Sequence, residues 1–122
     1  DIVSGEALVA NDNFSARYDL DRNKGIFSRP SHQLYLQSYV SKILVLNVAK
    51  GGVASAWMFR NMLENNKSPK GLLLNWANPI IAQGAAHANL TLIDRFDVDI
   101  TAAIQSGDLI TLNPKEGTVT IK

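Results

Sequence analysis

The 122-residue sequence contains no cysteine. This absence excludes disulfide bonds, and it excludes an iron–sulfur cluster or a zinc ion held by thiolates of this chain. Two histidines are present, His32 and His87, but neither lies in a pattern of closely spaced metal ligands. We therefore predict that both are surface or packing residues, and that the chain carries no cofactor of its own.

An excess of charge of one sign is also missing. The 12 Lys and Arg residues nearly balance the 11 Asp and Glu residues, which gives a formal net charge of +1. This balance does not favour nucleic acid or an anionic membrane as a partner. The hydrophobic runs are much shorter than the roughly 20 residues of a membrane span, and no signal-peptide pattern is visible. We expect a cytoplasmic protein that binds neither nucleic acid nor membrane.

The length and the hydrophobic content of 46% fit one domain with one core. We therefore predict a single domain over residues 1–122. The centre of this domain alternates apolar runs with helical patterns, and nearly continuous apolar runs are typical of parallel strands covered on both faces. The expected strands are Ile43–Asn47, Leu72–Trp76 and Leu90–Ile93, and the expected helices are Ser55–Asn65 and a segment that opens at Asn78-Pro79. This β/α/β/α/β order implies right-handed crossovers.

Both ends of the chain are predicted to be rich in β-structure. The expected N-terminal strands are Glu6–Asn11, Phe14–Tyr18 and Gly25–Phe27, with the polar turn Asp19–Lys24 before the last of them. The segment Ser31–Ser41 is predicted to be a loop with a short helical turn. Near the C-terminus we expect a short helix Ala102–Gln105, capped by Asp99 or Thr101, and a hairpin of Leu109–Asn113 and Thr118–Ile121.

The sequence also predicts the packing, burial or solvation of several individual side chains. Gly84, Ala85 and Ala86 would let the second helix lie close to a neighbour. Trp57 and Trp76 are predicted to be buried in the core, with contact to a partner as the alternative. Arg17 and Asp19 are predicted to be solvated charges.

The most informative segment is Lys42–Trp57, in which a strand pattern, Gly51-Gly52 and a helical pattern follow one another. The first turn of a helix has backbone N–H groups with no partner inside the helix, and such a turn can bind an anion. Lys50 would add positive charge, and the two glycines would allow the backbone to approach a carboxylate or phosphate. The alternatives are a close-packed turn without a ligand, a solvated Lys50, and Ser55 or Gly52 at the helix cap.

Known nucleotide-binding and hydrolase motifs are not found. The spacings of the Walker and dinucleotide-binding motifs are missing around Gly51-Gly52, and no nucleophile-elbow pattern surrounds any serine. The calcium-binding pattern of an EF-hand is incomplete near Asp19.

Four segments, taken in order, resemble the small swivelling domain of the aconitase X family. They are SGEALVANDNFS, KILVLNVAKGG, LLLNWANPIIAQGAA and IQSGDLITLNPKEGTVTI. The resemblance implies an α/β fold, namely a swivelling β/β/α domain with the central β/α/β/α/β unit flanked by β-rich terminal segments. It also implies a hydro-lyase (dehydratase) for hydroxy acids, such as cis-3-hydroxy-L-proline or mevalonate 5-phosphate. The small subunit would close over a separate large catalytic subunit, which would hold any iron or iron–sulfur centre.

The segments that would face the substrate depart from the family pattern. The family turn resembles Gly-Arg-Gly-Ser, whereas this chain has Ala49, Lys50, Gly51 and Gly52, so the cation is kept and the serine is replaced. An earlier family loop resembles Leu-Ser-Phe-Trp-Gly-Gly, and only Ser15 matches it well.

The resemblance implies that Lys50, Gly51 and Gly52 bind a substrate carboxylate or phosphate, and that Ser55 and Ser15 are the candidate catalytic hydroxyls. We expect the chain to be inactive without its large subunit. Loss of the family serine keeps an alternative open, a non-catalytic anion-binding or regulatory swivelling domain. A swivelling phosphohistidine carrier is disfavoured, because neither histidine lies in the glycine turn.

Overall fold

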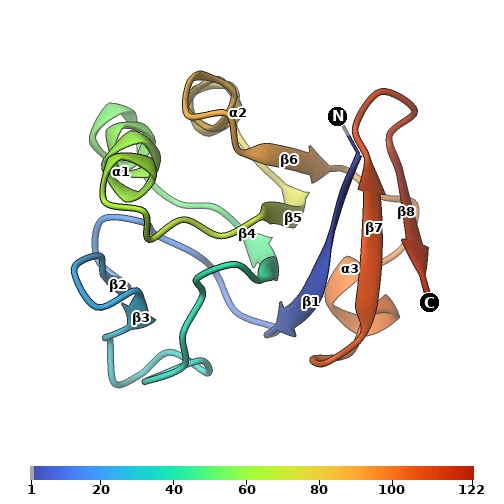
Figure 1. The fold of residues 1–122 in the computed structure, drawn as a ribbon, viewed down its shortest axis with the longest axis horizontal. Helices are drawn as coiled ribbons and strands as arrows, with labels where there is room; N and C mark the ends of the chain where they lie inside the picture. Colours follow the sequence, from blue (N-terminus) through green and yellow to red (C-terminus); the bar gives the residue numbers. More distant parts are fainter. Residues whose placement is uncertain (1) are drawn as a thin grey trace.

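A curled six-stranded sheet forms the centre of the computed structural model, which describes residues 2–122 (Figure 1). The strand order is β6-β5-β4-β1-β7-β8. The strands β1, β4, β5 and β6 are parallel to one another, while β7 and β8 form an antiparallel hairpin that joins the sheet along β1. The bounds are β1 Val3–Val9, β4 Ile43–Val48, β5 Gly71–Trp76, β6 Thr91–Asp94, β7 Leu109–Asn113 and β8 Thr118–Ile121.

Helices cover both faces of the parallel half of the sheet. Figure 1 shows α1 (Val53–Glu64) and α2 (Pro79–His87) on one side and the short α3 (Ile100–Ala103) on the other. A separate two-stranded ribbon, β2 (Leu20–Asp21) with β3 (Ile26–Phe27), lies in the N-terminal third of the chain. The predicted β/α/β/α/β unit and the C-terminal hairpin are confirmed.

The side chains of β4 alternate between two apolar clusters. Leu44 and Leu46 pack with α1 residues such as Phe59, whereas Ile43 and Val45 pack on the side of α3. All four β4 side chains are fully buried. The continuous apolar run of this strand therefore follows from its position between two layers, because neither face of the sheet contacts water here.

The starts of the two longer helices differ. At α2, Asn78 is the cap residue, its Oδ1 accepts a hydrogen bond from Ile81 N at 2.8 Å, and Pro79 occupies the first turn, as predicted. At α1, the cap position is Gly52, and within residues 2–122 no side chain accepts a capping hydrogen bond there. Of the two alternatives for this cap, Gly52 is confirmed, whereas Ser55 lies inside α1 and is buried.

The small residues of α2 do allow a close approach. A Cβ added at Gly84 would lie 2.5 Å from Ala56 Cβ of α1, which is too close for a real contact. Glycine at this position therefore permits the observed packing of α1 against α2, and the expectation from the sequence is confirmed.

The structure corrects several of the expected elements. The first strand spans Val3–Val9 rather than Glu6–Asn11, and β2 (Leu20–Asp21) lies inside the segment Asp19–Lys24 that was expected as a turn. The segment predicted as the strand Phe14–Tyr18 makes a single bridge, between Phe14 and Ala49, and then turns, with Asp19 N donating to Ser15 O at 3.0 Å. The short C-terminal helix spans Ile100–Ala103 rather than Ala102–Gln105, since Asp99 accepts from Thr101 N and starts the helix earlier.

Three burial expectations were wrong as well. Trp57 and Trp76 are 63% and 44% exposed, and Asp19 is only 3% exposed. Trp57 lines an open groove between α1 and α2, and Trp76 is the last residue of β5. Asp19 is buried because it accepts hydrogen bonds from Ser15 N and from Arg29. No helix within residues 2–122 is long and apolar enough to cross a membrane.

Candidate functional site

The candidate site lies where β4 ends and the chain turns into α1. Gly51 has a φ of +111°, a conformation that side chains with a Cβ rarely adopt. A Cβ at Gly51 would also overlap the side chain of Ser55, whereas a Cβ at Gly52 would meet no atom of the described residues within 4 Å. Asn78 Nδ2 donates to Gly51 O at 3.2 Å and ties the turn to the start of α2. Gly51 is thus required by the turn, and Gly52 is not.

The first turn of α1 is suited to an anion. Its residues Val53, Ala54 and Ser55 carry no negative charge, and within residues 2–122 no side chain caps their N–H groups. The positive end of the helix dipole lies at the same place. Lys50 is exposed two residues before the cap position, so its ammonium group adds charge that a carboxylate or phosphate can use.

A second segment, residues 11–15, runs beside this turn. Phe14 N donates to Val48 O at 2.9 Å, and Lys50 N donates to Phe14 O at 2.6 Å. These two bonds extend the pairing beyond the end of β4 and bring Ser15 next to the Lys50–Gly52 turn in the fold. Ser15 and the Lys50–Gly52 turn, which lie on separate segments of the sequence, are therefore neighbours at one edge of the sheet.

The two candidate hydroxyls have different surroundings. Ser55 is 2% exposed and packs against Gly51. Ser15 is 9% exposed, its main-chain N–H donates to Asp19 Oδ2 at 2.8 Å, and its Oγ accepts from Tyr18 N at 3.4 Å. Ser15 is thus the better exposed of the two and lies in a loop rather than inside a helix.

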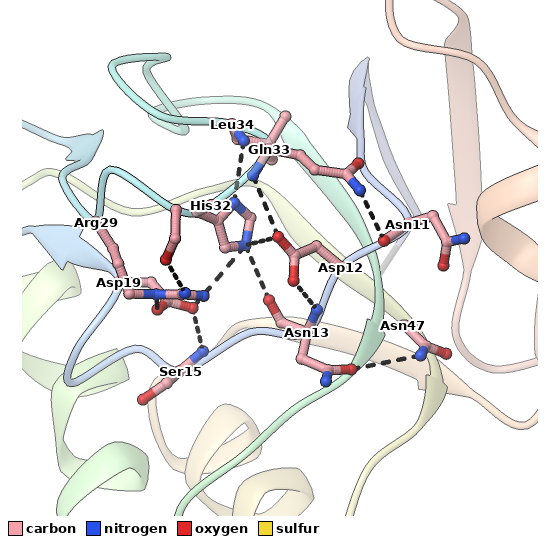
Figure 2. A network of polar contacts seen from close by, with 11 residues as sticks. Asn11, Asp12, Asn13, Ser15, Asp19, Arg29, His32, Gln33, Leu34 and Asn47 are labelled. Carbon is pink, nitrogen blue, oxygen red and sulfur yellow. Dashed lines mark hydrogen bonds and ion pairs between the residues drawn. The ribbon is translucent and has the colours of Figure 1, made fainter.

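A polar network that was not anticipated surrounds Ser15 (Figure 2). Its centre is His32, a buried side chain between residues 12–15 and the loop after β3. Arg29 Nε donates to Asp19 Oδ1 at 2.5 Å, and Arg29 Nη1 donates to Ser31 Oγ at 2.6 Å. The hydrogen bond to Asp19 raises the pKa of Arg29 further above its usual value.

Asp12 belongs to the same network. Its Oδ2 accepts from Gln33 N at 3.1 Å and its Oδ1 accepts from Asn13 N at 2.8 Å. Partial burial raises the pKa of the Asp12 carboxyl, but these two backbone hydrogen bonds and the nearby positive charge of Arg29 outweigh it, so the pKa lies below its ordinary value.

Asparagine side chains continue the network along the carboxyl ends of the strands. Asn47 Nδ2 donates to Asn13 Oδ1 at 3.4 Å, and Asn75 Nδ2 donates to both Asn47 Oδ1 at 3.0 Å and Asp99 Oδ1 at 2.9 Å. The bonds from Asn75 and Thr101 lower the pKa of the Asp99 carboxyl. This chain of amides connects the loop at Asn13 with the start of α3.

The site does not offer ligands for a metal. No group of three or more His, Cys, Asp or Glu side chains able to hold an ion occurs within residues 2–122, and the sequence has no cysteine. Among residues 2–122, His32 is engaged by main-chain groups.

Solved structures resemble the whole chain. A crystal structure of aconitase X from Thermococcus kodakaraensis, in its holo-form, matches with a TM-score of 0.92 and 26% identity, over 100% of this chain and 91% of that chain. A solution NMR structure of a UPF0107 protein matches with a TM-score of 0.89 and 29% identity, over 100% of this chain and 92% of that chain. The swivelling-domain fold expected from the sequence is confirmed.

Sequence comparisons agree. The phosphomevalonate dehydratase small subunit of Methanococcoides burtonii is 29% identical over 118 residues, which are 97% of this chain and 86% of that protein. The protein of the same name from Archaeoglobus fulgidus is 30% identical over 117 residues, which are 96% of this chain and 88% of that protein. The family model described as aconitase X swivel domain matches residues 1–121. The chain therefore belongs to the aconitase X swivel-domain family.

Proposed function

We propose that this chain is the small subunit of an aconitase X-type hydro-lyase that dehydrates a phosphorylated hydroxy acid. The observation that carries the proposal is the similarity, along 97% of this chain, to a protein named phosphomevalonate dehydratase small subunit. The site supports it, because the first turn of α1 and Lys50 together favour a small anion.

The geometry of the turn supports the following division of roles. Lys50 and the first N–H groups of α1 would hold the phosphate or a carboxylate of the substrate, and Gly51 and Gly52 would let that group approach the backbone. Ser15 would position the substrate or transfer a proton. Ser55 is the second candidate hydroxyl, and its burial against Gly51 means that it would reach substrate only after a movement of the turn.

The remaining chemistry would come from a separate large subunit. A dehydratase holds a carboxylate, removes a proton next to it and expels hydroxide, and it works best when water is excluded. A small domain that closes over a larger one can complete such a site and shield it. Any iron or iron–sulfur centre would belong to the large subunit, since this chain offers no ligand cluster within residues 2–122. We expect this chain alone to be inactive.

The proposal is tested by reconstitution with the large aconitase X subunit from the same organism. Mevalonate 5-phosphate, mevalonate and cis-3-hydroxy-L-proline are supplied separately, and loss of water is followed by NMR through the signals of the new double bond. We expect the phosphorylated acid to be dehydrated far faster than mevalonate. Dehydration of hydroxyproline alone would contradict the proposed substrate class.

A non-catalytic anion-binding or regulatory domain is the second candidate, and the observation that favours it is Gly52. Nothing in the described residues prevents a serine there, since a Cβ would meet no atom within 4 Å. The hydroxyl is thus missing without a steric reason. A gene for a large aconitase X subunit next to the gene for this chain would favour the enzyme, and an isolated gene would favour the binding domain.

A further inference from the structure

His32 is held from both sides of its ring. Its Nδ1 lies 3.0 Å from Leu34 N, and its Nε2 lies 2.9 Å from Asn13 O. Since a main-chain N–H can only donate and a carbonyl can only accept, Nδ1 is the acceptor and Nε2 carries the proton. The hydrogen-bond network thus assigns the neutral Nε2–H tautomer.

The two bonds of His32 together tie its own loop to a segment that is far away in the sequence: the bond with Leu34 is local, and the bond to Asn13 spans 19 residues. Leu34 belongs to the loop after β3, whereas Asn13 belongs to the segment that leads into Ser15 (Figure 2). The same two segments are tied again through Asp12, which accepts from Gln33 N. Ser15 N is fixed in turn by Asp19, which Arg29 holds.

The segment that His32 holds is also paired with the glycine turn. Phe14, the residue between Asn13 and Ser15, exchanges main-chain hydrogen bonds with Val48 and Lys50. Residues 13–15 therefore lie between His32 on one side and the end of β4 on the other. A shift of Asn13 would be passed on directly to Phe14, and from there to Ser15 and to the main chain of Lys50.

We propose that His32 is a positioning residue, which acts through Asn13 to set Ser15 against the Lys50–Gly52 turn. This inference rests on the proposed function of that site. Two carboxylate oxygens lie near Nε2, Asp12 Oδ2 at 3.8 Å and Asp19 Oδ2 at 3.9 Å. The two main-chain contacts are much shorter, so hydrogen bonding to the backbone defines the position of the ring.

Filling space would not require a histidine. The ring stacks on Phe27 at 4.6 Å between centroids, a contact that a phenyl ring could also make. A phenyl ring could neither donate to Asn13 O nor accept from Leu34 N, and would leave both polar groups unpaired in the interior. The two hydrogen bonds therefore distinguish positioning from packing.

Two substitutions separate the two hydrogen bonds. In His32→Gln, the side-chain amide can place a donor near the position of Nε2, so the bond to Asn13 O can be kept. In His32→Asn, the shorter side chain can accept from Leu34 N but does not reach Asn13 O. Asn and Gln are equally polar, but only Gln can keep the hydrogen bond to Asn13 O. His32→Gln is therefore the conservative variant in this test.

The variants are compared in the reconstituted complex, below the unfolding temperature of the less stable one. We expect His32→Asn to lower kcat/KM by about tenfold to a hundredfold, as for a small misplacement of a catalytic group, and His32→Gln to stay close to the wild type. A main effect on kcat is expected, because Ser15 moves while Lys50 still binds the anion. Equal losses in both variants, in proportion to their loss of Tm, would overturn the inference.

A measurement without substrate separates this inference from the proposed function. Hydrogen exchange of the Ser15 and Lys50 amides is followed by NMR in the full chain, and we expect faster exchange in His32→Asn than in His32→Gln. The difference in exchange is expected even if the wild-type complex dehydrates none of the acids. Such a lack of activity would overturn the proposed function but not the positioning role of His32. Identical exchange in both variants would overturn the positioning role.

Discussion

At the scale of single residues, Lys50 is an exposed cation that comes two positions before Gly52, the cap residue of α1. We expect Lys50→Ala to raise KM for a phosphorylated substrate by about tenfold or more, since a hydrogen bond to a charged group contributes about 1.5–3 kcal/mol. The change in kcat should be small. Lys50→Arg keeps the charge and is the matched control.

Steady-state kinetics of the reconstituted complex measure this effect. An unchanged KM in Lys50→Ala would remove Lys50 from the site. A loss of folding stability is not expected, because the side chain is exposed.

Asp12 gives a second prediction at this scale. Its pKa in the folded chain lies below the ordinary value, so the ionised form stabilises the fold above the unfolded pKa of about 4. That contribution is lost as the pH falls from about 4 through the folded pKa. We expect Asp12→Asn to weaken the dependence of unfolding free energy on pH in this acid range.

Urea unfolding between pH 2 and pH 7 would show the difference. Asp97→Asn, at an exposed position, is the control. If the unfolding free energy of Asp12→Asn fell with acid pH as it does in the wild type, this result would contradict the described hydrogen bonds of the Asp12 carboxylate.

At the scale of elements, the junction of β4 and α1 contains two neighbouring glycines with different constraints. Gly51 has a positive φ and no room for a Cβ beside Ser55, while Gly52 has neither constraint. We expect Gly51→Ser to destabilise the chain by about 2 kcal/mol or more. Gly52→Ser should change stability by only a few tenths of a kcal/mol, because serine and glycine differ little at a helix cap.

Chemical denaturation of the two variants tests this contrast directly. Equal effects at both positions would show that the turn is not built as described. Gly52→Ser also returns the hydroxyl of the family pattern, so its kinetics in the complex show whether that hydroxyl contributes to turnover.

The elements differ in how much of them the sequence could predict. The strand β4 was predictable because Ile43–Leu46 is an unbroken apolar run, buried on both faces. The cap of α2 was predictable because Asn78-Pro79 is a local signal. The turn at Ser15 was not predictable, because it depends on hydrogen bonds from Arg29 to Asp19 and from His32 to Asn13. These partners are 10 and 19 residues apart, and no periodicity in the sequence indicates such contacts.

The candidate site was likewise predictable where it depends on a local pattern, and not where it depends on contacts between loops. The glycine turn follows from a local strand–glycine–helix pattern, and the family resemblance added Ser15. His32 and Asn13 carry no local signal, since their roles depend on how two loops meet. The cap of α1 was left open between Ser55 and Gly52, because a hydroxyl suits a cap position as well as a glycine does, and the helix begins two residues before Ser55.

At the scale of the whole molecule, an apolar groove of about 360 Å³ lies between α1 and α2. It is lined by Val53, Trp57, Ile80 and Gly84 among others, and Trp57 is 63% exposed. The groove begins at Val53, directly after Gly52. A large subunit that covers the glycine turn would therefore also cover the groove, and a buried tryptophan is a frequent centre of such an interface.

We expect Trp57→Ser to weaken retention of the large subunit on a column that carries this chain, with a Kd raised by about tenfold or more. The reason is loss of apolar area at the centre of the contact. Ile121→Ser, on the last strand of the sheet and 46% exposed, is the control and should not change retention. Equal retention of both variants would place the interface elsewhere.

The most direct measurement is a titration of the isolated large subunit with this chain, with dehydration of mevalonate 5-phosphate as the signal. We expect the large subunit alone to be nearly inactive, this chain alone to be inactive, and the activity to rise with added chain to a plateau. A large subunit that reaches the same rate without this chain would contradict the claim that the swivelling domain completes the active site.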